Sequence, residues 1–154
     1  MTTVAKLMTL KGRRALITGA AGHIGRVIAQ TLAELGADLL LVDRPAAIYG
    51  TLIEEIERDW RVKVQIFDCD LELQGDRDRL IESVRQQRGG LDVLVNNAAF
   101  VGTSDLQGWV TDFEQQTVET WRRALEVNLI AAFDLSKGLA PLLKQSKRRR
   151  SLIN

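Results

Sequence analysis

The chain has 154 residues, of which 45% are hydrophobic and 27% are charged. These values are close to the average for globular proteins and predict one domain with a real core, which excludes whole-chain disorder, a collagen repeat and a disulfide-stapled miniprotein. Lysine and arginine number 21 and aspartate and glutamate 20, so the net charge is +1. That balance gives no general attraction to nucleic acid or to an anionic membrane, and we expect neither as a partner.

Cysteine, histidine and the longest apolar runs limit where the protein works and what it binds. The single cysteine, Cys69, cannot close an internal disulfide, which fits a reducing compartment. The longest apolar runs, such as Leu39–Val42, are far shorter than the ~18 residues of a membrane span. One cysteine and one histidine at distant positions give no metal-ligand spacing. We expect a cytoplasmic protein without a metal site.

Short apolar runs alternate with segments of helical periodicity in the first part of the chain. The pattern predicts buried strands at 15–18 and 38–43, helices at 24–35 and 48–60, and a sheet-edge strand at 62–66, where apolar and polar residues alternate. The apolar faces expected to be buried are Ile24, Val27, Ile28, Leu32 and Leu35 in the first helix and Ile48, Leu52, Ile56 and Trp60 in the second.

The second half of the chain continues this alternation. A third helix is predicted around 80–84, a fourth strand at 91–95 and a polar loop at 102–108. A long helix follows at 117–144, and residues 151–154 begin a fifth strand. The predicted apolar face of the long helix consists of Trp121, Leu125, Leu129, Ala132, Leu135 and Leu139, and Pro141 is expected to kink or end the helix.

Four alternations of strand and helix predict parallel βαβ units with right-handed crossovers. We therefore expect a doubly wound α/β sheet that stops at the start of strand five, with one domain over residues 1–154 that is incomplete at its C-terminal end. Such a sheet leaves strand four with a short neighbour and the apolar face of the long helix uncovered. We expect the chain to be marginally stable or a homo-oligomer that associates through helix 117–144.

A glycine-rich turn lies between the first predicted strand and the first predicted helix. Glycines permit a tight turn and close approach of the backbone to a diphosphate, and the helix N-terminus offers free N–H groups and a positive dipole. The sequence therefore predicts a diphosphate site at Gly19, Gly22, His23, Ile24 and Gly25. For His23, the only histidine, a solvated loop position is an equally good interpretation.

Asp43 ends the second predicted strand, 18 residues after Gly25. A carboxylate at this place accepts both hydroxyls of an adenosine ribose and repels a 2′-phosphate, which favours NAD over NADP as the cofactor. Arg44 follows directly and softens that repulsion.

Over its whole length the chain resembles the short-chain dehydrogenase/reductase family. The segments that carry the resemblance, specific in their order and spacing, are Thr18 to Gly25, Asp43, Asp70-Leu71, Asn96-Asn97-Ala98-Ala99 and Val127-Asn128-Leu129. The resemblance implies a Rossmann-type sheet that binds a nicotinamide dinucleotide.

The resemblance also implies roles for single residues. Asp70 and the Leu71 amide would hold the adenine, and Asn97 and Ala98 would line the path of the nicotinamide-side ribose. Asn128 would anchor a water in a proton relay and is thus the one expected catalytic residue of this chain.

Two features depart from the commonest branch of the family. The glycines are spaced TGxxGxxG and not TGxxxGxG, and Ala99 stands where that branch has a glycine. Both features are similar to the extended branch that modifies sugar nucleotides, whereas the paired Asn96 and Asn97 are similar to the commonest branch. The branch, and with it the substrate, stays open.

The family's reaction uses a serine and a tyrosine with a lysine four residues later. The lysine stabilises the phenolate, because a tyrosine with a pKa near 10 is a poor base at neutral pH. Tyr49 is the only tyrosine here, Ile53 stands four residues on, and the second helix places it beside the adenosine end. Neither the serine nor Tyr-x-x-x-Lys is in this chain.

We therefore expect the NAD-binding part of an oxidoreductase that, in a longer parent, moves a hydride between nicotinamide and a secondary alcohol or carbonyl. By itself this chain is expected to be inactive. Two alternatives remain: a non-catalytic module that binds or senses NAD, and a structural or assembly subunit that uses helix 117–144.

Overall fold

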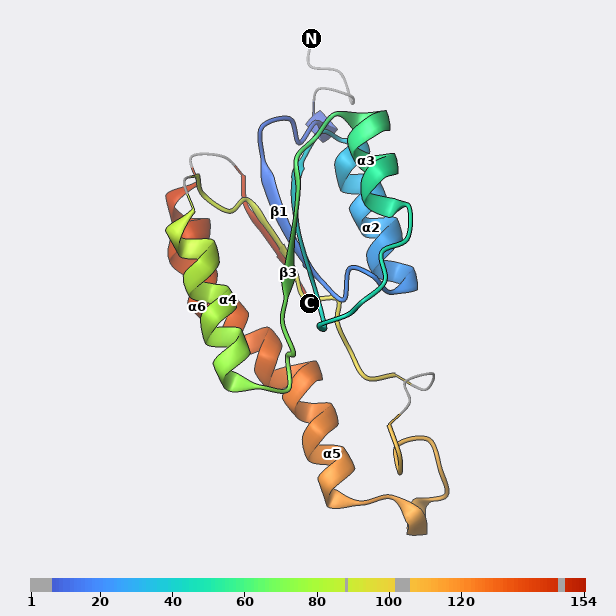
Figure 1. The fold of residues 1–154 in the computed structure, drawn as a ribbon. Helices are drawn as coiled ribbons and strands as arrows, with labels where there is room; N and C mark the ends of the chain where they lie inside the picture. Colours follow the sequence, from blue (N-terminus) through green and yellow to red (C-terminus); the bar gives the residue numbers. More distant parts are fainter. Residues whose placement is uncertain (1–6, 88, 102–105, 147–148) are drawn as a thin grey trace.

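A parallel five-stranded sheet forms the middle layer of the protein, which we describe from a computed structural model covering residues 7–87, 89–101, 106–146 and 149–154. The strand order is β3-β2-β1-β4-β5. This order, with helices on both faces of the sheet (Figure 1), confirms the predicted Rossmann-type doubly wound fold. The strands are β1 (Arg14–Thr18), β2 (Asp38–Asp43), β3 (Val64–Asp68), β4 (Val93–Val95) and β5 (Ser151–Ile153).

Helices cover both faces of the sheet (Figure 1). Helices α2 (His23–Glu34) and α3 (Leu52–Trp60) lie on one face, and α4 (Gln74–Gln86) and α6 (Ala132–Gln145) lie on the other. The chain enters α6 through α5 (Val118–Leu125) and the π-helical segment η2 (Glu126–Ala131), preceded by the short helix η1 (Phe113–Gln115). We call residues 118–145, which comprise α5, η2 and α6, the helical arm.

The core consists of two clusters, one on each face of the sheet. Along β1, Ala15 and Ile17 face α2 and α3, whereas Leu16 between them faces α4 and α6. The same alternation in β2 places Leu39 with α2 and α3 and Leu40 with α4 and α6. Because both faces are covered, these central strands are apolar throughout, which is why their positions could be predicted from apolar runs.

Strand boundaries follow the predictions with small shifts. β2 coincides with the predicted 38–43, and β3 begins two residues later than predicted but pairs with β2 alone, at the edge of the sheet. β4 is shorter than predicted. Asp92, just before it, accepts hydrogen bonds from the Arg14 amide at 2.9 Å and from the Ser146 hydroxyl at 2.5 Å.

The predicted buried face of the first helix is only partly right: Ile28 and Leu32 pack against the core, but the centre of the buried face lies elsewhere. Helix α2 packs on the sheet through Gly25, Ala29 and Ala33, which are all buried. Ile24 and Val27, expected in the core, are 69% and 62% exposed. Small side chains let the helix axis approach the strands closely, so the face in contact with the sheet is the one with the least side-chain volume.

The second predicted helix begins later than expected. Helix α3 starts at Leu52, and Leu52 and Ile56 are buried as predicted. Ile48 lies before the helix and is 81% exposed, and Trp60 is only half-buried. Tyr49, predicted to lie within this helix, lies in the segment that leads into it.

The segment predicted as one long helix is not a single α-helix. The π-helical segment interrupts it, and the arm extends through Pro141 to Gln145. The predicted apolar face is therefore partly wrong: Leu135 and Leu139 are buried, but Leu129 is 58% exposed. Apart from Ile130, the exposed large apolar side chains of the arm recur at three- and four-residue spacing, and we call them the outer stripe: Val118, Trp121, Leu125, Leu129 and Phe133. Of the predicted polar loop, residues 102–105 lie outside the described ranges.

Candidate functional site

The carboxyl ends of β1 to β4 open into a cleft of about 740 Å³. In doubly wound sheets ligands bind at this edge, where the order of the strands reverses. All ten residues predicted to bind the cofactor line this single cleft: Gly19, Gly22, His23, Ile24, Gly25, Asp43, Asp70, Leu71, Asn97 and Ala98.

Two glycines of the turn after β1 are required by close backbone packing. Gly19 has a φ of +65°, and a Cβ there would lie 2.9 Å from the Cα of Ala98. A Cβ on Gly25 would lie 2.1 Å from the Gly19 carbonyl oxygen. The turn therefore folds back on its own helix and on the segment after β4, which leaves its outer surface free to face the cleft.

The N-terminus of α2 faces this cleft. Gly22 precedes the helix in an extended conformation and provides no side-chain cap. The first-turn amides of a helix have no intrahelical acceptor, and the helix dipole adds positive potential at this end. His23 and Ile24 begin the helix, are exposed, and line the cleft. This end of α2 can accept an anion such as a diphosphate.

Asp43 fixes the turn as well as facing the cleft. Its Oδ2 accepts a hydrogen bond from the amide of Ala21 at 2.8 Å, and its Oδ1 accepts one from the amide of Arg44 at 2.8 Å. A carboxylate oxygen has further acceptor capacity, so these contacts leave room for ribose hydroxyls. Arg44 lines the same cleft, so charges of both signs lie where β2 ends.

Thr18 is a structural residue of this site; it belongs to the matching segment Thr18 to Gly25, but no role for its side chain was predicted from the sequence. Its buried hydroxyl accepts hydrogen bonds from the amides of Asn97 at 3.0 Å and Ala98 at 3.1 Å. In return, the side-chain amide of Asn97 donates to the carbonyl oxygens of Thr18 at 2.9 Å and Gly19 at 3.2 Å. A polar residue at the end of an otherwise apolar strand was the available clue.

Arg26 is a second such residue, located one turn into α2. Its Nε donates to the carbonyl oxygen of Ala21 at 2.8 Å, and its Nη1 donates to that of Tyr49 at 2.7 Å. The guanidinium thus ties the glycine turn to the segment between β2 and α3. Nothing local in the sequence indicates these partners.

The segment after β3 forms the far wall of the cleft. The amide of Asp70 donates to Oδ2 of Asp76 at 3.1 Å, and Oδ1 of Asp70 accepts from the amide of Glu72 at 3.0 Å. Cys69 lines this wall but is 1% exposed, and burial raises the pKa of its thiol to about 12. As predicted, Cys69 occupies the end of a strand; at neutral pH it is an unreactive thiol.

Asn128 lies in the π-helical segment and outside the lining of the cleft. Its Oδ1 accepts from the amide of Phe100 at 2.7 Å, and its Nδ2 donates to the carbonyl oxygen of Phe100 at 3.0 Å. Asn128 thus fixes the backbone that follows Asn97 and Ala98. Single π turns are often found at functional sites. The water-anchoring role of Asn128 stays a prediction.

Tyr49 is placed where it cannot act in this cleft. It is 8% exposed, packs in the core with Leu52 and Ile56, and is not among the lining residues. Burial, with Asp43 and Asp68 nearby, raises the pKa of its hydroxyl above the ordinary value. This agrees with the expectation that Tyr49 is not the family's proton donor.

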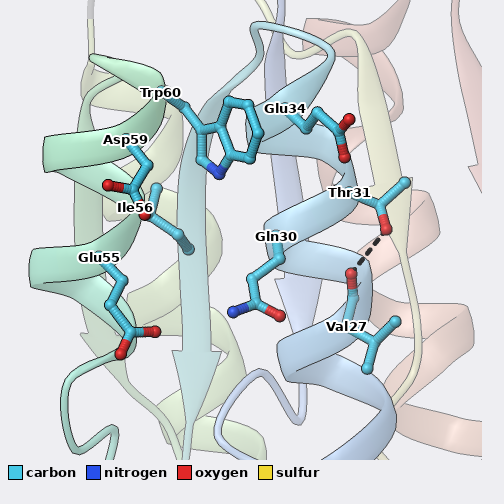
Figure 2. A pocket seen from close by; sticks show the side chains of 8 residues that line it. All are labelled: Val27, Gln30, Thr31, Glu34, Glu55, Ile56, Asp59 and Trp60. Atoms are coloured by element: carbon cyan, nitrogen blue, oxygen red, sulfur yellow. Dashed lines mark hydrogen bonds between the residues drawn. The ribbon is translucent and has the colours of Figure 1, made fainter.

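A second, smaller hollow of about 330 Å³ lies between α2 and α3 (Figure 2). None of the predicted site residues lines it. Two of its three carboxylates are already engaged, since Glu55 accepts from Thr51 and Asp59 pairs with Arg58. The hollow is lined by Val27, Gln30, Thr31, Glu34, Glu55, Ile56, Asp59 and Trp60.

Within the described ranges, no group of three or more His, Cys, Asp or Glu side chains is arranged to hold a metal ion. Over the same ranges, no helix has the length and apolar character needed to cross a membrane.

The sheet order, the glycine turn and the cleft define a dinucleotide-binding Rossmann protein. The comparison with known families is more specific: the short chain dehydrogenase family model matches residues 13–154. The chain belongs to this family, whose fold binds NAD or NADP.

Similar proteins are identical to the chain at about a third of the aligned positions. It is 31% identical over 139 residues to the hydroxysteroid 11-beta-dehydrogenase 1-like protein of Danio rerio, covering 90% of this chain and 46% of that protein. It is 32% identical over 138 residues to the rhamnolipids biosynthesis 3-oxoacyl-[acyl-carrier-protein] reductase of Pseudomonas aeruginosa, covering 90% and 50%. The chain thus spans about half the length of these relatives.

A solved structure supports the fold. L-sorbose reductase from Gluconobacter frateurii, complexed with NADPH and L-sorbose, superimposes with a TM-score of 0.77 at 31% identity. The match covers 89% of this chain and 49% of the reductase.

Proposed function

We propose that this chain is the NAD-binding part of a short-chain oxidoreductase that transfers a hydride between nicotinamide and a secondary alcohol or carbonyl. The observation that supports the proposal is the meeting of ten predicted residues, from segments far apart in the sequence, at the walls of one cleft. In this proposal residues 1–154 act as a single dinucleotide-binding domain and the substrate is bound by the longer protein.

In the proposed complex the chain's own groups divide the cofactor between them. The N-terminus of α2 binds the diphosphate, with Gly19 and Gly22 allowing its approach. Asp43 accepts the adenosine ribose hydroxyls, and Asp70 with the Leu71 amide holds the adenine. The bound nicotinamide would supply the hydride acceptor or donor.

NAD is the proposed cofactor, although four of the similar solved structures are described with NADPH or NADP. The support is the carboxylate of Asp43, which lines the cleft at the end of β2 and would lie against a 2′-phosphate. Arg44 beside it gives NADP a weaker alternative contact.

Calorimetric titration of the 154-residue chain with NAD and with NADP tests this assignment. Replacing Asp43→Asn keeps an acceptor for the Ala21 amide but removes the charge, and it should weaken NAD binding about tenfold, as the loss of a charged hydrogen bond does. Asp38→Asn, at the opposite end of β2, is the matched control and should change NAD affinity less than about twofold. Tighter binding of NADP than of NAD by the unmodified chain would overturn the cofactor assignment.

We propose that the chain alone does not complete the reaction, because its one tyrosine is buried away from the cleft. The test is absorbance at 340 nm with NAD and a panel of secondary alcohols. No alcohol-dependent rise is expected, and such a rise would contradict the proposal. If NAD does not bind to the chain at all, the result would favour the alternative that the chain is a structural or assembly subunit.

We also propose that two copies associate through the outer stripe. Its five side chains range from 46% to 68% exposed, although each is apolar. Glu119 and Arg122 flank the stripe, and both are exposed, so two antiparallel copies of α5 would place opposite charges together. Leu125→Lys should reduce the mass found by light scattering, whereas Val27→Lys on α2 should not.

A further inference from the structure

Helix α4 carries an arginine that is almost completely buried. Arg77 is 1% exposed, and arginine is rarely buried unless it is paired. Its Nε donates to Oδ2 of Asp134 in α6 at 3.1 Å, and its Nη2 contacts Oε1 of Glu126 in η2 at 2.7 Å. Its Nη1 donates to the carbonyl oxygen of Leu71 at 2.5 Å, and Nη2 also donates to Gln74 at 2.7 Å. One guanidinium therefore joins α4, the far wall of the cleft and the helical arm.

Stability alone is a weak reason for an arginine at this place. Removing a guanidinium from water costs several kcal/mol, and well-packed apolar side chains often stabilise such a site as well or better. The two carboxylate partners retain 35% and 21% exposure, so neither requires a buried cation to be solvated. The planar guanidinium does offer donors in fixed directions, which sets the relative geometry of the groups that it contacts.

The groups that Arg77 contacts lie in the wall of the cleft and in the π-helical segment that carries Asn128. Leu71 lines the cleft on the proposed adenine side, whereas Glu126 precedes Asn128 by two residues in η2. Since η2 is a single π turn, a shift of Glu126 also moves Asn128. Asn128 in turn holds both backbone groups of Phe100, a residue that lines the cleft.

A second arginine also connects the far wall of the cleft to the helical arm. Arg123 of α5 pairs with both carboxylate oxygens of Glu72, at 2.6 and 2.8 Å. Its guanidinium carbon lies 5.8 Å from the centre of the Phe100 ring. The far wall of the cleft is thus attached to the arm at two consecutive residues, and both attachments lead to the backbone that Asn128 fixes.

We propose that Arg77 is a positioning residue that couples occupation of the adenine side of the cleft to the position of Asn128. Binding of adenine against Leu71 orders the carbonyl that Arg77 contacts, and the guanidinium transmits this order to Glu126 and η2. The inference rests on the proposed function, since it takes the wall at Leu71 to be the adenine site.

Adenosine diphosphate is a suitable probe because it contains the adenine and the diphosphate but no nicotinamide. We would titrate it into the ¹⁵N-labelled 154-residue chain and follow its affinity together with the Phe100 amide resonance. In Arg77→Met we expect affinity to fall about tenfold and the Phe100 shift at saturation to disappear. Arg85→Met is the matched control: Arg85 also joins α4 to α6, through the carbonyl oxygen of Gly138, but does not contact the cleft wall. It should leave both readouts within about twofold.

Glu126→Gln keeps the test decisive if Arg77→Met fails to fold. It weakens only the contact with η2, so the affinity for adenosine diphosphate should change less than about threefold while the Phe100 shift falls by at least half. A merely structural role for Arg77 would lower stability without separating these two readouts. An unchanged shift in Glu126→Gln would overturn the inference alone. Failure of the unmodified chain to bind either adenosine diphosphate or NAD would overturn the proposed function and the inference together.

Discussion

Helix α2 and the helical arm both leave large apolar side chains exposed, but for different structural reasons. Helix α2 buries the small residues Gly25, Ala29 and Ala33 and exposes Ile24 and Val27. The arm buries large residues such as Leu135 but leaves an equally apolar outer stripe exposed. Close approach to the sheet selects the buried face in α2, whereas the π turn changes the phase of the faces in the arm.

The two exposed faces have different consequences. Ile24 of α2 lines the cleft, so its exposure provides an apolar wall for a ligand. The outer stripe runs from α5, which extends beyond the sheet (Figure 1), through η2 to the start of α6, and in our proposal its exposed side chains contact a second chain. We therefore propose that exposed apolar side chains contact a ligand in one helix and a second chain in the other.

Comparing Leu135 with Leu129 tests the arm. Leu135→Ala removes a fully buried side chain and should lower the free energy of unfolding by about 3 kcal/mol, whereas Leu129→Ala should lower it by less than about 1 kcal/mol. Urea denaturation at pH 7 measures both, at a chain concentration low enough to prevent association. Equal losses would show that the outer stripe is buried within a single chain.

Comparing Gly25 with Gly22 tests α2. A Cβ on Gly25 would lie 2.1 Å from the Gly19 carbonyl oxygen, so Gly25→Ala must displace the backbone and should cost about 2 kcal/mol. A Cβ on Gly22 meets that same oxygen at 3.3 Å, and Gly22→Ala should cost less than about 1 kcal/mol. The same urea titration serves for both variants. A smaller loss for Gly25→Ala than for Gly22→Ala would contradict close packing of α2 as the reason for its buried face.

Much of the fold could be predicted from the sequence because its evidence is local. β2 coincides with the predicted 38–43, since a strand covered on both faces is a continuous apolar run. The glycine turn could be placed because only glycine suits the close contact of Gly25 with Gly19. The buried faces of α2 and the arm could not, because Ala29 and Ala33 do not stand out in an apolar pattern and a π turn has no local sequence marker.

The site also combines residues that the sequence could indicate with residues that only the structure reveals. Ten of its lining residues could be named. The glycine turn and Asp43 lie at the ends of predicted strands, and the ends of parallel strands meet at one edge. Asp70, Leu71, Asn97 and Ala98 were implied by the resemblance to the family. Arg26 and Arg77 were missed, since their partners are carbonyl oxygens and carboxylates of distant segments. An arginine in a helical pattern is ordinarily a solvated residue, and only tertiary structure reveals its burial.

The smallest expected effect concerns the ion pair between Glu72, in the far wall of the cleft, and Arg123 of the helical arm. The hydrogen bond from Arg123 lowers the pKa of Glu72 from its ordinary value of 4.5. A carboxyl group with a lowered pKa in the folded state contributes stability above its unfolded pKa and loses that contribution as the pH falls through the folded value. Because Arg123 is 46% exposed, the contribution is below about 1 kcal/mol at pH 7.

Glu72→Gln should therefore lower the free energy of unfolding slightly at pH 7 and have progressively less effect as the pH falls below 4.5. Glu119→Gln is the control, since its carboxylate is 73% exposed and lies 3.9 Å from Arg122. Urea titrations of both variants at pH 7 and at successively lower pH give the comparison. A difference between Glu72→Gln and the unmodified chain that does not shrink on acidification would mean that the ion pair with Arg123 does not connect the cleft wall to the arm in solution.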